Sequence, residues 1–276
     1  ITISAGSTTG TVSFTPTDDS VYEGNETATI AISSVTGEAS ESGTQAVTIT
    51  ITENESAPTV TLYMKIDSSG YDYITTSVYE YNSSTSLRIE AKLSGATDED
   101  VTVALSTSGT ATEGTDYTDG SGNLDDITIS AGSTTGSINF IRSDDSVYEG
   151  DETATIAISS VSGGSATESG SQSVTITIRD NESAGSVTLT VSATSIAENA
   201  GSSLTITATL SGATDEDVTV GLSTSGTATE GTDYTDGSGV IDDITISAGS
   251  TTGTVNFTPT DDSVYEGNET ATIAIS

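Results

Sequence analysis

An internal repeat constrains this chain more than any other feature. Residues 1–33, ITISAGSTTGTVSFTPTDDSVYEGNETATIAIS, recur at 244–276 with one change, Ser13 to Asn256. A looser copy begins at Ile127, and the segments SGATDEDVTV (94–103 and 211–220) and GTATEGTDYTDGSG (109–122 and 226–239) each occur twice. A chain that repeats itself is built from copies of one structural unit. We therefore expect an array of similar domains.

The copies divide the chain into three units. Residues 58–184 form a complete unit, residues 1–57 form the back half of a unit, and residues 185–276 form a unit that lacks its last strand. Because both ends fall inside a unit, we expect the chain to be a piece of a longer array.

Apolar residues alternate with polar ones over short stretches, which is typical of β-strands. In the third unit the alternation predicts strands A to F, in this order, around 187–191, 204–210, 218–222, 244–246, 255–257 and 271–275, and the middle unit adds a seventh, strand G, at 174–178. Seven short strands separated by turns form a sandwich. We predict an all-β chain of tandem immunoglobulin-like, seven-stranded antiparallel β-sandwiches that together form an elongated rod.

The charge of the chain selects its partners. With 41 acidic and 5 basic residues the formal net charge is −36, so nucleic acid phosphates would be repelled and cations are the natural partners. No apolar run approaches the roughly 20 residues of a membrane span, so we expect no span in this segment.

Cysteine and histidine are both absent. Their absence removes disulfides, the usual zinc ligands and the general base of a Ser-His-Asp triad, and we expect no enzymatic activity. A thiol-free, acidic β chain fits the cell surface or the extracellular space.

The predicted topology gathers carboxylates at one end of each sandwich. Successive connections alternate between the two ends, so the A–B, C–D and E–F loops and the tail after strand G share an end. In the third unit these loops hold Glu198, Glu230, Asp233, Asp261, Asp262, Glu266 and Glu269. Crowded carboxylates repel one another unless they are protonated or bound to a metal, and hard oxygen ligands suit Ca²⁺. The alternative is a set of solvated acidic loops.

Three segments of the chain, GTATEGTDY, DDSVYEGNET and VTITIRDNE, resemble the Calx-beta motif of sodium/calcium exchangers and large bacterial surface proteins. The resemblance covers the whole chain and implies a seven-stranded sandwich that binds calcium at the acidic end. By position it implies metal ligands in the middle unit at Glu80, Asp116, Asp144, Asp145, Glu149, Glu152, Asp180 and Glu182. In the third unit it implies Glu198, Asp233, Asp261, Asp262, Glu266 and Glu269, and in the first unit Asp18, Asp19, Glu23, Glu26, Glu53 and Glu55. The first unit departs from the motif, because Glu53 and Glu55 stand where the family usually has aspartates.

Only SAPT or SAGS separates consecutive units. Linkers this short are not flexible coils, so an ion bound at the junction would stiffen the rod. The acidic triplets 98–100 and 215–217 then face the site of the preceding unit. We expect them to help bridge the junction, with a solvated turn as the alternative.

Half of the ten tyrosines lie in an insertion at 63–86 of the middle unit: Tyr63, Tyr71, Tyr73, Tyr79 and Tyr81. The insertion is either a lateral contact or glycan-binding surface, or an extended hairpin packed on its own sandwich.

The sequence as a whole predicts a calcium-stabilised stalk or fibre repeat of a large secreted or cell-surface protein, either an adhesin or an extracellular filament. Its partners would be Ca²⁺, neighbouring repeats and other copies in a fibre. The alternatives are a calcium-sensing regulatory module and a ligand-binding adhesin domain that uses the insertion.

Overall fold

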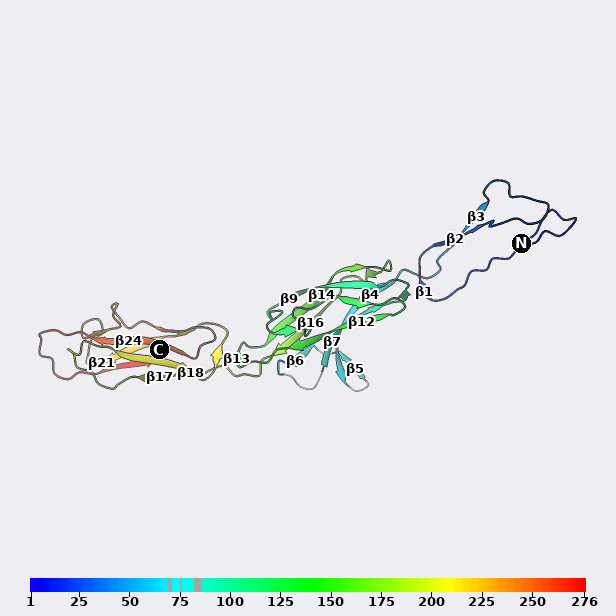
Figure 1. Cartoon of the computed structure of the whole chain (residues 1–276). Helices are drawn as coiled ribbons and strands as arrows, with labels where there is room; N and C mark the ends of the chain where they lie inside the picture. The colour runs from blue at the N-terminus through cyan, green and yellow to red at the C-terminus, as the bar shows by residue number, and fades with distance from the viewer. Residues whose placement is uncertain (69–70, 75, 82–85) are drawn as a thin grey trace.

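The computed structural model describes residues 1–68, 71–74, 76–81 and 86–276, and the three predicted units follow one another along an elongated molecule (Figure 1). The regular elements in these ranges are β-strands. None of the described residues forms a helix of the length and apolarity that crossing a membrane requires. The prediction of an all-β chain is confirmed.

The second unit is a sandwich of two sheets. One sheet runs in the order β10 (Tyr117–Thr118), β12 (Thr135–Arg142), β7 (Ser86–Leu93), β4 (Thr59–Ser68) and β15 (Thr167–Glu168), with β5 (Tyr71–Ile74) also paired to β4. The other runs in the order β11 (Ile127–Ile129), β9 (Val101–Gly109), β14 (Glu152–Ser162), β16 (Ser173–Arg179) and β6 (Ser77–Tyr79). The long ladders are antiparallel, as predicted. Two short edge pairs, β15 with β4 and β6 with β16, are parallel.

The core of the second unit is self-contained. Inward-facing residues of β7 such as Leu87 and Ile89 meet those of β14 such as Ile156, and Tyr117 stacks on Phe140 with 4.9 Å between ring centroids. All members of this buried cluster fall between residues 60 and 178. Burial of this apolar surface supplies the main driving force for folding of the unit.

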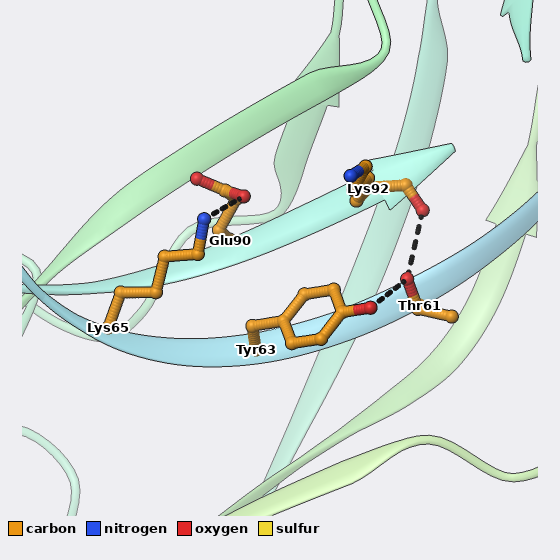
Figure 2. Close-up of polar contacts among 5 residues, drawn as sticks. All are labelled: Thr61, Tyr63, Lys65, Glu90 and Lys92. Carbon is orange, nitrogen blue, oxygen red and sulfur yellow. Dashed lines mark hydrogen bonds and ion pairs between the residues drawn. The ribbon is translucent and has the colours of Figure 1, made fainter. Parts of the chain in front are cut away.

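The outer face of β4 and β7 is polar (Figure 2). The register places Tyr63 opposite Glu90, and Lys65 forms an ion pair with Glu90 at 2.6 Å. Thr61 Oγ1 lies 3.1 Å from the hydroxyl of Tyr63 and 3.3 Å from the carbonyl oxygen of Lys92. Alternation along the strands thus separates an apolar inner face from a hydrogen-bonded outer face.

The described part of the 63–86 insertion pairs with its own sandwich: β5 lies antiparallel beside β4, and β6 lies parallel beside β16. This pairing supports the hairpin alternative. Tyr79 and Tyr81 remain exposed, with ring centroids 5.3 Å apart, and the guanidinium of Arg179 lies 5.8 Å from the Tyr79 ring. The side chains of Tyr71 and Tyr73 fall outside the described residues.

The third unit repeats this plan. One sheet has the order β17 (Val187–Val191), β18 (Leu204–Leu210), β24 (Thr252–Pro259) and β22 (Tyr234–Thr235). The facing strands form two pairs, β20 (Val218–Val220) with β23 (Ile244–Ile246) and β21 (Leu222–Gly226) with β25 (Ala271–Ile275). A smaller buried cluster includes Ile206, Val220 and Ile246. Strands therefore form at all six stretches predicted for this unit.

The first unit contains only β1 (Val21–Tyr22), β2 (Glu26–Ala31) and β3 (Ala46–Ile51), with β2 and β3 paired antiparallel. Residues 1–20 form no strand, whereas the nearly identical residues 244–263 form β23 and β24. In the third unit those strands pair with β20 and β18, and the first unit has no corresponding front half. Strand formation here depends on the partner.

Short parallel strand pairs join successive units. β1 pairs with β8 (Ala96–Thr97), and β13 (Val147–Tyr148) pairs with β19 (Ala213–Thr214). The sequence analysis did not predict these pairs. They bring the E–F loop of one unit against the B–C turn of the next, and so align the acidic end of one sandwich with the next sandwich.

Candidate metal centre

The first carboxylate cluster of the second unit consists of Glu80, Asp180 and Glu182, whose oxygens lie within 4.8 Å of one another. Glu80 follows β6, and Asp180 and Glu182 follow β16, so the parallel pairing of these two strands brings the three residues together. Glu80 is 5% exposed, and the Asn181 N–H donates to its Oε1 at 3.4 Å. Burial, together with Glu182 and Asp180, raises the pKa of Glu80 to about 8.

The second cluster consists of Asp116, Glu149 and Glu152, again within 4.8 Å. Asp116 lies in the C–D loop just before β10. Glu149 directly follows β13, and Glu152 is the first residue of β14. Burial, followed by the charge of Asp116, raises the pKa values of Glu149 and Glu152 to about 7. Like charges held this close favour either a bound proton or a bound cation.

Asp180 connects the two clusters. Its Oδ2 accepts hydrogen bonds from the N–H groups of Glu149 (2.7 Å) and Gly150 (2.6 Å), and its Oδ1 accepts from that of Glu182 (2.7 Å). The tail after β16 is therefore fastened to the E–F loop through the backbone, which fixes the spacing of the surrounding carboxylates.

This donor set fits a hard divalent cation. Every candidate ligand is a carboxylate oxygen, and Oε2 of Glu182 is buried without a hydrogen-bond partner. A buried carboxylate oxygen without a donor is costly unless a proton or cation satisfies it. Glu80, Asp180 and Glu182 would hold one ion, and Asp116, Glu149 and Glu152 another, each with room in the coordination sphere for further oxygen ligands.

The third unit has two more clusters, which share Glu266: the exposed Glu198, Asp262 and Glu266, and the half-buried Asp233 with the exposed Glu266 and Glu269. The Asp262 N–H donates to Glu198 Oε1 at 3.1 Å. Asp233 is the main cause of the raised pKa of Glu266, and burial followed by Asp233 raises that of Glu269. The same loops thus converge in both units.

In the first unit Glu53 takes the position of Asp180. Its Oε2 accepts from the N–H groups of Glu23 (2.6 Å) and Gly24 (2.7 Å), and its Oε1 from those of Asn54 (2.9 Å) and Glu55 (3.0 Å). These backbone donors lower the pKa of Glu53 to about 2. Residues 1–57 are all described, and no three carboxylates among them come as close as in the other units.

The other predicted first-unit ligands form no such cluster, although the charge of Asp19 raises the pKa of Glu23. Asp18 accepts from the Asn54 side-chain amide at 3.2 Å, Asp19 accepts from the Val21 N–H at 2.8 Å, and Glu26 is exposed at the start of β2. A glutamate fills the aspartate position while the front half of the unit is absent. Metal binding by the first-unit residues stays a prediction.

Several acids of the same loops serve their own loop. Asp145 accepts from the Val147 N–H at 2.7 Å, and Glu230 accepts from the Thr224 hydroxyl (2.8 Å) and the Ile241 N–H (2.6 Å). Asp144 and Asp261 belong to none of the clusters found among the described residues. Sequence position alone does not separate these loop-forming acids from the clustered ones.

The acidic triplets divide their roles by position. Asp100 Oδ1 accepts from the Ala131 N–H at 2.8 Å and Asp217 Oδ1 from the Ala248 N–H at 2.9 Å, so each last acid stabilises its own unit. The first acid adjoins the preceding unit: the Asp215 N–H contacts the Tyr148 carbonyl oxygen at 3.4 Å, and the Asp215 charge raises the pKa of Glu149. At the first junction the charge of Asp98 likewise raises the pKa of Glu23.

The family model of the Calx-beta domain matches residues 1–55, 66–182 and 180–276. The chain belongs to the Calx-beta family. Among solved structures, this Calx-beta chain is similar to the apo-form Calx CBD1 domain, with 21% identity over 44% of this chain and 98% of that chain, at a TM-score of 0.33. It is also similar to the calcium binding domain CBD12 of CALX1.1, with 22% identity over 72% of this chain and 77% of that one, at a TM-score of 0.33. No curated protein matches this Calx-beta chain.

Proposed function

We propose that this Calx-beta chain is a calcium-stabilised structural segment of a stalk or fibre in a large secreted or cell-surface protein. The observation that supports this most directly is the position of the carboxylate clusters. The clusters of the second unit lie at the end of the sandwich that meets the third unit, and the charge of Asp215 in the third unit raises the pKa of Glu149 across that junction. An ion bound there would neutralise charge at the point where two units meet.

The proposed mechanism is electrostatic. Without a cation, Asp116, Glu149, Glu152 and Asp215 repel one another across the junction at neutral pH. Ca²⁺ would supply the opposite charge and hold the E–F loop, the C–D loop and the tail after β16 in one arrangement. A stiffer junction keeps successive sandwiches in line, which is what a stalk requires.

The direct test is isothermal titration of residues 58–184 with Ca²⁺, because the core of this unit is self-contained. We expect binding heat with a dissociation constant of roughly 0.1–1 mM, as in extracellular modules. The double variant Glu80→Gln/Glu149→Gln should weaken it at least tenfold, and Asp125→Asn, an exposed acid outside the clusters and the predicted ligands, is the matched control. Absence of binding heat in the wild-type unit would refute the proposal.

The bridging role of the triplets has its own test. Asp215→Asn in the full chain should weaken Ca²⁺ binding at the second unit several-fold if its carboxylate contributes across the junction. Asp217→Asn is the matched control, since an amide oxygen still accepts from the Ala248 N–H. Equal affinities in the two variants would assign Asp215 to a solvated turn.

A second candidate function is glycan binding by the insertion, which the exposed Tyr79 and Tyr81 rings favour. Aromatic rings exposed to solvent are suited to stacking on sugars. Binding of residues 58–184 to a glycan array, lost on Tyr79→Ser/Tyr81→Ser, would favour this candidate over a simple spacer. A calcium-sensing regulatory module would instead show a large change of shape on Ca²⁺ addition at constant ionic strength.

A further inference from the structure

The two inter-unit strand pairs are copies of one contact. Val21 pairs with Ala96 and Tyr22 with Thr97, while Val147 pairs with Ala213 and Tyr148 with Thr214. In the first contact the Asp98 N–H lies 3.3 Å from the Tyr22 carbonyl oxygen, and in the second the Asp215 N–H lies 3.4 Å from that of Tyr148. A Val-Tyr segment and an Ala-Thr turn therefore meet in the same register at both junctions.

A third Val-Tyr segment has no such neighbour. Residues 263–269 have the same sequence, SVYEGNE, as residues 20–26. Val21 and Tyr22 are half-buried and form a strand, whereas Val264 is 61% exposed, Tyr265 is 96% exposed and neither is in a strand. The two settings differ in the adjoining turn and in the tail after the last strand, whose Glu53 accepts from the Glu23 and Gly24 N–H groups in the first unit.

The exposed Val264–Tyr265 segment already follows the same local turn that precedes the paired Val-Tyr segments. The Val264 N–H donates to Asp262 Oδ1 at 2.6 Å, as the Val21 N–H does to Asp19 (2.8 Å) and the Val147 N–H to Asp145 (2.7 Å). Such Asx turns fix the local backbone. Binding at this position therefore requires little further ordering of the chain.

The opposing turn is equally fixed. The Thr97 hydroxyl donates to the Glu99 carbonyl oxygen (2.7 Å), and the Gly132 N–H donates to the Thr97 carbonyl oxygen (2.8 Å). In the third unit the Thr214 hydroxyl donates to the Glu216 carbonyl oxygen (2.8 Å), and the Gly249 N–H donates to the Thr214 carbonyl oxygen (2.7 Å). Two preformed segments that pair through their backbones are a form of strand addition.

We propose that Val264–Tyr265 is a docking site for the Ala-Thr turn of another Calx-beta repeat that carries the SGATDED sequence. The Val-Tyr segment and the Ala-Thr turn together form a clasp that aligns successive repeats. Both Ala-Thr turns of this chain are already paired, so the occupant is the turn of a further repeat. This proposal identifies the partner of the Val264–Tyr265 surface and rests on the proposed stalk function. The backbone contacts of the clasp themselves involve no calcium.

The repeat itself supplies the experiment. Because residues 1–33 and 244–276 differ at one position, residues 34 onward can be joined after Ser276 without altering the local sequence. One extended chain carries residues 34–57 after Ser276 and only supplies the missing last strand of the third unit. The other carries residues 34–184 and also supplies a complete unit with the Ala96–Thr97 turn, whose core is self-contained.

The readout is nitration of tyrosines by tetranitromethane, followed by peptide mass mapping. Tyr265 lies on a peptide that contains Asn256 and Tyr22 on one that contains Ser13, so their masses differ. We expect Tyr265 to react several-fold more slowly in the chain extended by 34–184 than in the chain extended by 34–57. Tyr22 and Tyr148, which are covered in both chains, are the internal references. Equal reactivity of Tyr265 in the two chains would overturn the proposal.

Two variants of the appended unit sharpen the test. Asp98→Pro removes the N–H that faces the tyrosine carbonyl and should restore nitration of Tyr265, whereas Asp98→Asn retains that N–H and should not. Melting of each variant verifies that the appended unit is folded, and the comparison of the two unsubstituted chains does not depend on it. Protection of Tyr265 in chelator, in a chain that binds no Ca²⁺, would contradict the proposed function while supporting the clasp.

Discussion

At the scale of single residues, Asp180 is central to the acidic end of the second unit because it accepts several backbone hydrogen bonds. Its carboxylate receives three backbone N–H groups from two segments, those of Glu149, Gly150 and Glu182. Acidic neighbours surround it without comparable backbone contacts. Its structural role can therefore be separated from any role as a ligand.

Asp180→Ala should lower the free energy of unfolding of residues 58–184 by about 2–3 kcal/mol, because several N–H groups lose a charged acceptor. The measurement is urea denaturation in chelator, where an effect on calcium binding does not enter. Asp144→Ala, which removes an exposed acid, should change the stability by less than about 0.5 kcal/mol. Similar values for the two variants would contradict the assignment.

The raised pKa values of Glu80, Glu149 and Glu152 predict how stability varies with pH. Their ordinary value is 4.5, and in the folded unit they reach about 8, 7 and 7. The folded state therefore binds more protons than the unfolded chain between these limits, and stability falls as pH rises from about 4.5 to 8. Bound Ca²⁺ requires the deprotonated ligands, so calcium affinity should rise over the same range.

Thermal melting of residues 58–184 in chelator, from pH 5 to pH 8, checks this prediction. The triple variant Glu80→Gln/Glu149→Gln/Glu152→Gln should melt at a temperature that varies much less with pH. A wild-type melting temperature that increases steadily toward pH 8 in chelator would show that these carboxyl groups are not held in the neutral form.

At the scale of strands, partners decide which segments become regular. Residues 1–20 lack strands, whereas the same sequence forms β23 and β24 when β20 and β18 adjoin it. Joining residues 185–243 in front of Ile1 would restore those partners. We expect segments equivalent to 244–246 and 252–259 to become protected from hydrogen exchange at 1–3 and 9–16, with a matching increase in β signal by circular dichroism.

Gly109 at the end of β9 tests strand geometry directly. It adopts φ +125°, and a Cβ built there would approach the Thr153 carbonyl oxygen to 2.1 Å; Gly226 of the third unit is in the same position relative to Thr270. Gly109→Ala should destabilise residues 58–184 by at least about 1–3 kcal/mol from backbone strain alone. Gly95→Ala meets no atom within 4 Å and is the control for denaturant unfolding.

At the scale of the whole molecule, the net charge of −36 opposes alignment of the units. Exposed charges are screened beyond about 8 Å at physiological ionic strength, so the repulsion is strongest where carboxylates crowd at the junctions. We expect Ca²⁺ to lengthen the rod in small-angle scattering and to slow proteolysis between units. NaCl of equal ionic strength is the control, and scattering that is unchanged by chelator would contradict the proposed stiffening.

The sequence by itself determined the class of fold, the main strands of the third unit and the convergence of acidic loops at one end of the sandwich. These follow from period-2 alternation and from the fixed parity of strand connections, both of which are local or topological properties. The loops that supply Glu198, Asp233 and Glu266 could be identified on that basis, and the resemblance to the Calx-beta motif implied their counterparts Glu80, Asp116 and Glu149.

Only the tertiary structure decided which residues of those loops meet. Asp116 joins a cluster while Glu230 serves its own loop, and the parallel pairing of β6 with β16 brings Glu80 to Asp180. Identical sequences at residues 20–26 and 263–269 differ in structure, because only the first pairs with the next unit and accepts the tail that carries Glu53. The physical reason is that a strand's hydrogen bonds are made with a partner, and a sequence does not specify which partner will be present.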